Sequence, residues 1–265
     1  MTYTPTFEPG EYRCPTTHYR IEIDGRKILY AYIRKNACTA FKMMINRDLH
    51  PAYVANAALG REPKDRYNIN GNMRYFAVTP KALAADPVYD ASVFVHRDPV
   101  ARFVSVYTNK FIDVSGADDI RRNYEALTGL SFEQATFDDF MRYAGNDFAK
   151  LDCHLWPQKA HLWPMVYTAP VAIGDLEAGM AALIGPEAAH TWFGRKINAS
   201  RTGEGPSDRI LTDVPAADLR RLQAEGAVIT AEAFVTDAVR AFVAEKYASD
   251  YAMLAACRAD LRTAA

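Results

Sequence analysis

The chain has 265 residues, of which 49% are hydrophobic and 24% are charged, an ordinary composition for a globular protein that builds its own core. A net formal charge of −1 gives no overall attraction to nucleic acid or to an anionic membrane, so any anion site must be local. We therefore expect no nucleic-acid partner. The length suits one large α/β domain or two small ones.

The cysteines and the N-terminal sequence bear on the cellular compartment. Four widely spaced cysteines form no CxxC pair: Cys14, Cys38, Cys153 and Cys257. The sequence MTYTPTFEPGEYRCP lacks the basic and apolar regions of a signal peptide. No apolar run reaches the length of about 18 residues that a membrane span needs. The sequence thus predicts reduced thiols, a cytoplasmic location and no transmembrane anchor, and it leaves the oligomeric state open.

The first elements in chain order are predicted to be strands. Residues 18–33 read as a β-hairpin that turns at Asp24-Gly25. A helical pattern of apolar residues then begins at Ala40. Two short apolar runs, RYFAV (74–78) and SVFVH (92–96), are predicted to be buried parallel strands.

Helices dominate the rest of the chain. Asp98-Pro99 is a helix start, with an N-cap carboxylate before a proline. After it, an apolar stripe contains Val100, Phe103, Val104, Tyr107 and Phe111, while Arg102, Ser105 and Asn109 point elsewhere. Further helices are predicted near 118–127, 136–144, 176–184, 215–225 and 230–246, and MVYTAPVAIGD (165–175) offers one or two strands. This alternation predicts a single three-layer α/β/α domain over 1–265 with a mainly parallel sheet, and the polar segment 195–209 resembles a lid.

The joint between strand and helix at residues 34–40 is suited to an anion, because a helix N-terminus presents unpaired N–H groups. Lys35 and the hydroxyl of Thr39 can both hold phosphate-type oxygens. Lys42, in the first turn, is disfavoured by about 0.3–1 kcal/mol unless something negative lies there. Simple solvation of these lysines is the alternative. The joint is no Walker A loop, because no glycine occurs between Gly25 and Gly60.

A second joint of this kind lies at the end of the run 92–96. Arg97 follows the predicted strand, and Ser105 lies about two turns into the next helix. A guanidinium and a hydroxyl could close around one phosphate, with bidentate bonds from the arginine. The alternative is an ion pair between Arg97 and Asp98 or another carboxylate. Two such joints imply a ligand with two separated anionic groups, and we expect Thr39 and Ser105 to share one cleft.

Five segments, in order, resemble sulfotransferases of the carbohydrate (Golgi-type, family 2) branch in a bacterial-like form. The first is similar to the 5′-phosphosulfate loop of that family, and the second to its 3′-phosphate motif. The segments are IRKNACTAFK, VFVHRDPVARFVSVYTNKF, DCHLWPQKAHLWPMVYTAPVAIGDLEAGMAALIG, INAS (197–200) and EKYASDYAML (245–254). The resemblance implies the P-loop-NTPase-like sulfotransferase fold, 3′-phosphoadenosine 5′-phosphosulfate (PAPS) as the donor and PAP as the product.

Carried over by position, the resemblance also implies site residues. The residues that would wrap the 5′-phosphosulfate are Lys35, Asn36, Ala37, Cys38 and Thr39, with Arg34 or Lys42 as a second cation. Arg97 and Ser105 would hold the 3′-phosphate. The chain departs from the family where Arg34 replaces the usual Pro and Ala37 a frequent Gly, so we expect a stiffer loop.

Sulfuryl transfer needs a cation at the leaving oxygen and a base for the acceptor hydroxyl. We assign the cation to Lys35 and the base to His154, whose alternative role is to orient or support. Other candidate bases are Asp147, Asp152 and Glu62. Cys153, His154 and His161 lack zinc-like spacing, so we predict no metal. Tryptophans 156, 163 and 192 suit either sugar stacking or the core.

The sequence therefore predicts a metal-free sulfotransferase that moves a sulfuryl group from PAPS to a hydroxyl of a carbohydrate or glycolipid. The alternatives are a nucleotide or small-molecule kinase of related fold and a non-catalytic nucleotide-binding protein. The sequence does not name the acceptor, which we expect to be a small glycan, a lipid-linked sugar or a metabolite. We expect its determinants in the loops 60–73, 113–150 and 195–209.

Overall fold

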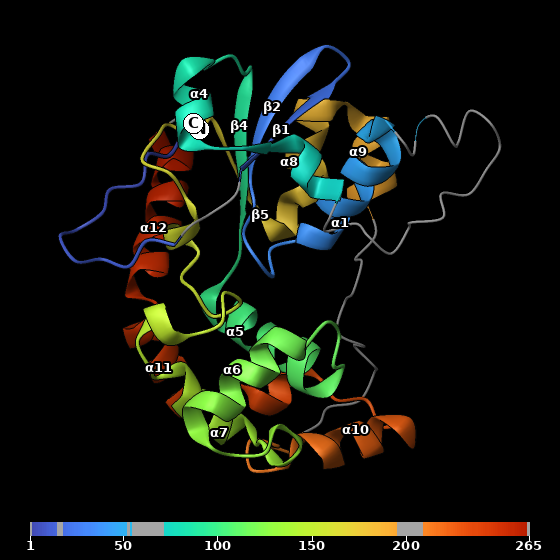
Figure 1. The fold of residues 1–265 in the computed structure, drawn as a ribbon, viewed down its shortest axis with the longest axis vertical. Helices are drawn as coiled ribbons and strands as arrows, with labels where there is room; N and C mark the ends of the chain where they lie inside the picture. The colour runs from blue at the N-terminus through green and yellow to red at the C-terminus, as the bar shows by residue number, and fades with distance from the viewer. Residues whose placement is uncertain (1, 15–17, 52–53, 55–71, 195–208, 264–265) are drawn as a thin grey trace. The chain divides into compact units, whose positions relative to one another are not determined.

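A computed structural model describes most of the chain (Figure 1). The described residues are 2–14, 18–51, 54, 72–194 and 209–263. The chain forms two compact units. The first unit comprises Met1–Arg97, Gln158–Ile197 and Met253–Ala265, and the second comprises Asp98–Pro157 and Asn198–Ala252. A single domain over 1–265 stays a prediction.

The first unit contains a five-stranded mixed sheet in the order β3-β1-β2-β4-β5. Its strands are β1 (His18–Ile23), β2 (Arg26–Ala31), β3 (Ala77–Val78), β4 (Ala91–His96) and β5 (Ala169–Ala172). Strands β2, β4 and β5 are parallel, and β1 runs antiparallel to β2 and to β3. The α/β prediction is confirmed, with a parallel part made by β2, β4 and β5 and an antiparallel edge made by the hairpin and β3.

The hairpin is confirmed, whereas one predicted strand is wrong. Asp24 and Gly25 form a two-residue turn at φ 51° and 76°, which joins the paired residues Ile23 and Arg26. In the predicted run 74–78, by contrast, Met73–Phe76 is a 3₁₀ turn, and β3 pairs at the sheet edge over Ala77–Val78. Tyr75 is exposed there, and the chain enters α4 (Pro80–Ala85) at a proline, which lacks the N–H that a strand ladder requires.

Alternate residues of β2 face opposite layers of helices in the first unit. Ile28 and Tyr30 face α1 (Cys38–Met44), and the ring of Tyr30 stacks on Phe41 with centroids 3.9 Å apart. The same layer holds α8 (Leu176–Ile184) and α9 (Pro186–Phe193). Leu29 and Ala31 face the opposite layer, which contains α4 and the residues of α12 (Ala248–Thr263) from Met253 onward. The predicted three layers are visible in this unit (Figure 1).

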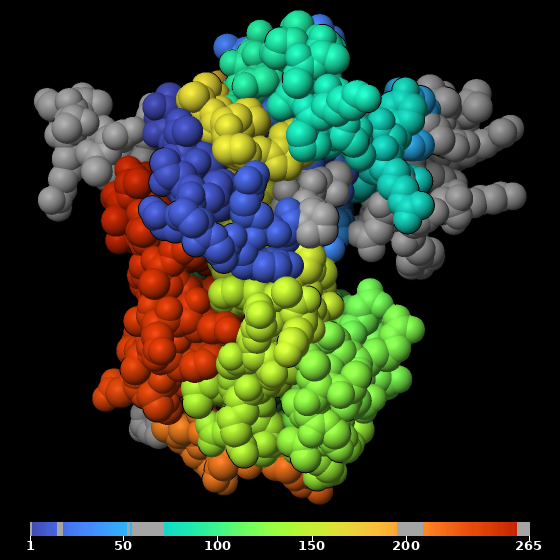
Figure 2. Space-filling view, turned by 60° about the vertical axis from the view of Figure 1, so that its left-hand side comes forward, coloured from blue at the N-terminus to red at the C-terminus, as the bar shows by residue number. Residues whose placement is uncertain are grey.

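The N-terminal segment lies along the chain that precedes β5. The backbones of Tyr3 and Tyr167 exchange two hydrogen bonds of 2.8 and 2.7 Å, and the N–H of Cys14 donates to the carbonyl of Ala160. Figure 2 shows this segment, in blue, against the yellow atoms of the segment that it covers. The N-terminus therefore closes one side of the first unit.

The second unit is helical around an aromatic core. Its helices are α5 (Pro99–Tyr107), α6 (Asp118–Thr128), α7 (Phe137–Ala144), α10 (Ala216–Ala224) and α11 (Asp237–Lys246). Phe103, Tyr107 and Phe140 lie in mutual ring contact inside it. These helices confirm the predicted ones, except that the region 230–246 begins with a 3₁₀ turn at Ala231–Phe234 and restarts at the N-cap Thr236.

All four cysteines are free thiols, as the sequence predicts. Across the described ranges, we find no helix with the length and apolar character that a membrane crossing requires.

Candidate functional site

The loop between β2 and α1 has an unusual backbone. Lys35 and Ala37 have φ angles of 69° and 55°, in the left-handed region that only glycine adopts without strain. Each such residue costs about 1–3 kcal/mol and persists where its surroundings hold it. Ala37 is the N-cap of α1, which begins at Cys38. The predicted anion loop is thus a turn with a strained backbone, which its surroundings must stabilise.

The loop presents three polar groups in the positions that the sequence suggests. Lys35, Thr39 and Lys42 are all half-buried rather than fully solvated. Within the described part of the chain, the Thr39 hydroxyl makes no hydrogen bond to protein, so it is available to a ligand. The predicted contacts of these residues with a donor stay predictions.

Cys38 lies in a positively charged environment. Burial by itself would raise the pKa of its thiol, but the charge of Lys42, a backbone hydrogen bond from Lys35 and a bond from the Tyr32 hydroxyl outweigh burial, so the pKa is lowered. Burial and the neighbouring Cys38 in turn raise the pKa of Tyr32. The thiolate form of Cys38 is therefore favoured by the same cations that would bind an anion.

The ring of Tyr32 supports two of those cations. The guanidinium carbon of Arg34 lies 5.5 Å from the ring centroid, and Nζ of Lys42 lies 5.0 Å from it. Both distances are within the range of a cation–π interaction. Arg34 and Lys42 therefore share one aromatic ring as their cation–π partner.

The second joint contacts the first. Arg97 directly follows β4, and its Nη1 donates to the backbone carbonyl of Lys35 at 3.3 Å. Asp98 acts as the N-cap of α5 and accepts the N–H of Ala101 at 2.9 Å, as predicted. Within the first unit, the strand end at Arg97 and the loop at Lys35 are thus neighbours.

Gln158 links the same two segments and was not predicted as a site residue. Its Oε1 accepts the backbone N–H of Arg97 at 2.9 Å and Nδ2 of Asn36 at 2.6 Å, and its Nε2 donates to the Arg97 carbonyl at 2.9 Å. Asn36 also donates to the carbonyl of Val95 at 2.7 Å. Both amides are buried, so the side chain of Asn36 anchors the loop, and its predicted contact with the donor stays a prediction. The sequence signal for Gln158 was its place in the family-like HLWPQ run.

Helix α5 of the second unit carries Ser105 and Arg102. Ser105 is half-buried, and its predicted bond to a 3′-phosphate stays a prediction, as does a cleft shared with Thr39 of the first unit. Arg102 does not face solvent but is 3% exposed, and its Nη2 donates to the carbonyl of His154 at 3.3 Å. The apolar stripe on α5 is confirmed.

The loop that carries His154 is fixed by hydrogen bonds from several elements of the second unit. The Tyr247 hydroxyl donates to the Leu155 carbonyl at 2.8 Å, and the Trp156 indole donates to the Leu151 carbonyl at 3.0 Å. The amide oxygen of Asn123, on α6, accepts the Asp152 N–H at 3.0 Å. These bonds fix the backbone on both sides of His154.

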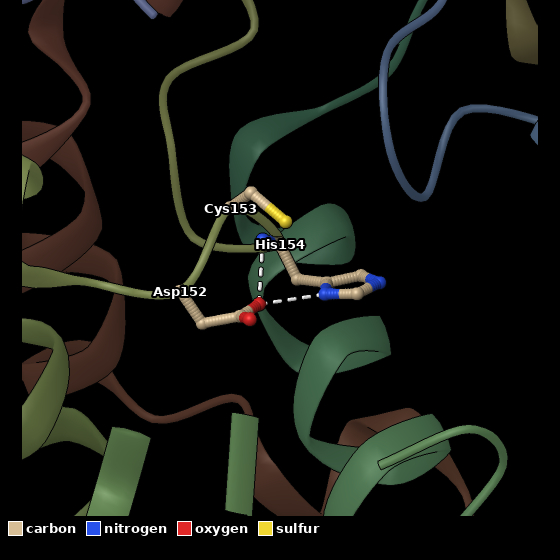
Figure 3. A group of neighbouring side chains, drawn as sticks. All are labelled: Asp152, Cys153 and His154. Carbon is tan, nitrogen blue, oxygen red and sulfur yellow. Dashed lines mark hydrogen bonds and ion pairs between the residues drawn. The ribbon is translucent and has the colours of Figure 1, made fainter. Parts of the chain in front are cut away.

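His154 is oriented by Asp152 (Figure 3). The carboxylate Oδ1 of Asp152 accepts both the backbone N–H of His154, at 2.9 Å, and its Nδ1, at 2.6 Å. A proton on Nδ1 leaves Nε2 of the neutral ring as a proton acceptor. The Asp152 side chain is 6% exposed and that of His154 is 20% exposed. This pair has the arrangement of a general base with an orienting carboxylate.

Cys153 joins this pair in a cluster that could hold a metal ion. Asp152, Cys153 and His154 each place one ligand atom within 4.8 Å of the others. The short bond between Nδ1 and Oδ1 already engages two of these groups, an arrangement better suited to acid–base chemistry than to a closed tetrahedral centre. The absence of a metal from the reaction stays a prediction.

The remaining candidates have other surroundings. His96 lies on the α12 face of β4 near Phe94, on the side away from α1, and burial and Arg258 lower its pKa. Exposed Asp147 caps a short 3₁₀ turn by accepting the N–H of Ala149.

The tryptophans and the predicted acceptor loops have different outcomes. Trp163 and Trp192 are core residues, and Trp156 is half-buried. Glu62, the loop 60–71, INAS and the lid segment through residue 208 lie outside the described residues.

A sequence model described as "Sulfotransferase family" matches residues 18–169, more than half of the chain. The match includes both joints, Gln158 and the loop of His154. Members of that family share the P-loop-like α/β fold that the sequence predicts. Comparison with curated proteins and with solved structures gave no match.

Proposed function

Because the chain belongs to the sulfotransferase family, of the family 2 type, we propose that it transfers a sulfuryl group from PAPS to a hydroxyl of a carbohydrate or glycolipid. The observation that carries this proposal is the contact of Arg97 with the Lys35 carbonyl. This contact makes neighbours of two cationic joints, which the two anionic ends of one nucleotide donor would require. PAP is the expected product.

Each end of the donor has its own proposed residues. The 5′-phosphosulfate is assigned to Lys35, Thr39 and the backbone around Cys38, with Lys42 and Arg34 as further cations over Tyr32. The 3′-phosphate is assigned to Arg97 and, by its place in the motif, to Ser105. The lowered pKa of Cys38 supports the first assignment, because it reports a local field that favours negative charge.

The proposed chemistry is one in-line displacement. The acceptor oxygen forms a bond to sulfur while the bond from sulfur to the bridging oxygen of the donor breaks, and that electron pair stays on the bridging oxygen. The Lys35 ammonium balances the charge that develops there. Nε2 of His154 takes the acceptor proton, and Asp152 stabilises the resulting imidazolium. These protein groups meet the demands of the step without a metal.

Two measurements test the function. Calorimetry should show much tighter binding of PAP than of ATP, since ATP lacks the 3′-phosphate. Incubation with PAPS and a panel of small glycans, lipid-linked sugars and metabolites should give a product that is heavier by one sulfuryl group in mass spectrometry. Absence of binding to both PAP and ATP, together with no transfer to any member of the panel, would contradict the proposal. A cytoplasmic location is a further prediction that these assays do not test.

A further inference from the structure

The side chain of Gln158 satisfies both backbone groups of Arg97. Pairing of β4 with β5 ends at His96, opposite Ala172, so no strand residue is paired with Arg97. Gln158 supplies an acceptor at 2.9 Å for the Arg97 N–H and a donor at 2.9 Å for its carbonyl. An amide side chain thus replaces a strand neighbour, which fixes the direction in which Arg97 leaves the sheet.

The same side chain also holds the loop of the first joint. Its Oε1 accepts Nδ2 of Asn36 at 2.6 Å. Asn36 lies between Lys35 and Ala37, the two residues whose positive φ angles make the loop strained. Such a backbone persists only where its contacts define it. The amide of Gln158, with 0% exposure, provides one of those contacts.

The bond from Arg97 to the Lys35 carbonyl closes a ring of contacts. The ring passes from Lys35 through its neighbour Asn36 to Gln158, on to Arg97, and back to Lys35. All four residues belong to the first unit. Two bonds already satisfy the backbone of Arg97, so the third bond of Gln158, to Asn36, is an additional link to the first joint. A ring of this kind lets a displacement at one joint reach the other.

We propose that Gln158 is a positioning residue that couples the two anion-binding joints, so that a phosphate bound at one joint organises the other. This inference rests on the proposed function, because the two ends of the donor are the ligands that it couples. Gln158 itself is not assigned to either end of the donor. It acts through the direction of Arg97 and through the conformation of the loop 35–37.

The coupling can be measured with four nucleotides. Calorimetry gives the dissociation constants of adenosine, adenosine 5′-phosphate, adenosine 3′-phosphate and PAP. The product of the two monophosphate constants, divided by the product of the adenosine and PAP constants, equals one when the phosphates bind independently. We expect a ratio of about five or more for the wild type, the lower end of usual coupling between sites. We expect Gln158→Met to bring it close to one.

A matched control separates coupling from stability. Ser92 is buried on β4, where its hydroxyl donates to the Val166 carbonyl and accepts the Thr168 N–H. Ser92→Ala removes two hydrogen bonds from the same strand without touching the ring of contacts. It should lower the melting temperature and leave the ratio at its wild-type value. Asn36→Ala is the second variant, since it removes the bond between Asn36 and Gln158 and leaves both bonds between Gln158 and the backbone of Arg97 in place.

The outcomes distinguish this inference from the proposed function. A wild-type ratio of one, or a Gln158→Met protein in which all four ligands weaken by the same factor, overturns the coupling while PAP binding persists. Should Gln158→Met not fold, the ratio in Asn36→Ala decides, and an unchanged value overturns the inference. Failure of the wild type to bind PAP removes the proposed function, and the coupling with it.

Discussion

Nη1 of Arg97 lies 3.3 Å from the backbone carbonyl oxygen of Lys35, so the residue after β4 contacts the loop after β2. The two strands are parallel neighbours, with Ala31 paired to Phe94. Because parallel strands end at the same edge of a sheet, their following loops meet there, where ligands of open α/β sheets bind. Sheet order therefore brings the Arg97 side chain to the backbone of the lysine-bearing loop, although the two are distant in sequence.

Arg97 should carry much of the affinity for a 3′-phosphate. Arg97→Ala should weaken PAP binding about 10- to 150-fold, since charged hydrogen bonds contribute about 1.5–3 kcal/mol. Binding of adenosine 5′-phosphate should change far less. Calorimetry with both nucleotides checks this difference. An equal loss for the two ligands would show that Arg97 supports the fold rather than the 3′-phosphate.

Lys35 should act on turnover more than on donor affinity. Lys35→Ala removes the charge assigned to the leaving oxygen, so kcat should fall about 10²- to 10³-fold, as with other transition-state donors. Lys42→Ala is the matched comparison, and we expect it to raise the KM for PAPS more than it lowers kcat. Steady-state kinetics at saturating acceptor separates the two effects. Normal turnover of Lys35→Ala with saturating PAPS would refute the assignment.

The pair of Asp152 and His154 should control the acid side of the rate profile. Transfer should slow as pH falls, because a protonated His154 cannot accept the acceptor proton. His154→Ala should lower kcat about 10²- to 10⁴-fold and abolish that dependence. Asp152→Asn should also lower kcat, since an amide cannot stabilise the imidazolium. A wild-type pH dependence in His154→Ala would place the base elsewhere.

Cys38 should react as a thiolate below the pH range of ordinary thiols. The lowered pKa of Cys38 makes its thiolate the favoured form at lower pH, so iodoacetamide should alkylate it there faster than buried Cys257. Lys42→Met removes one cause of the lowered pKa and should move the reaction to higher pH. Peptide mass spectrometry follows each cysteine separately. Identical pH profiles for Lys42→Met and the wild type would contradict this origin of the reactivity.

His18 should make the first unit sensitive to acid. It is fully buried, stacks on Trp163 with ring centroids 3.8 Å apart and shares a hydrogen bond with the Tyr167 hydroxyl, and burial lowers its pKa to about 3. Between pH 6.5 and about 3 the unfolded chain binds a proton that the folded chain does not, so stability falls as pH falls. The slope from this group approaches about 1.4 kcal/mol per pH unit. Urea unfolding from pH 7 to 4 measures it.

A His18→Phe variant tests the origin of that slope. Phenylalanine keeps the stacking partner of Trp163 and cannot be protonated, so the free energy of unfolding should depend less on pH. Its stability at pH 7 should be lower, because the buried Tyr167 hydroxyl loses its hydrogen bond to His18. An unchanged slope would assign the acid sensitivity to other groups.

The local elements followed from the sequence because short-range chemistry decides them. The turn at Asp24-Gly25, the cap at Asp98 and the helix after it formed as predicted. These features depend on φ preferences and on hydrogen bonds within a few residues. The strand predicted over 74–78 was wrong, although its apolar residues are typical of a strand. Only two of its residues pair, because the segment lies at the sheet edge and Pro80 follows it.

By itself, the sequence determined the kinds of residues in the candidate site: a lysine loop after one strand, an arginine after another and a histidine in a family-like segment. Only the tertiary structure decided that Gln158 joins Asn36 to Arg97, that Asp152 orients His154 and that Arg102 is buried. The reason is physical. Which partner satisfies a buried polar group depends on which strands and helices become neighbours, and spacing along the chain does not contain that information.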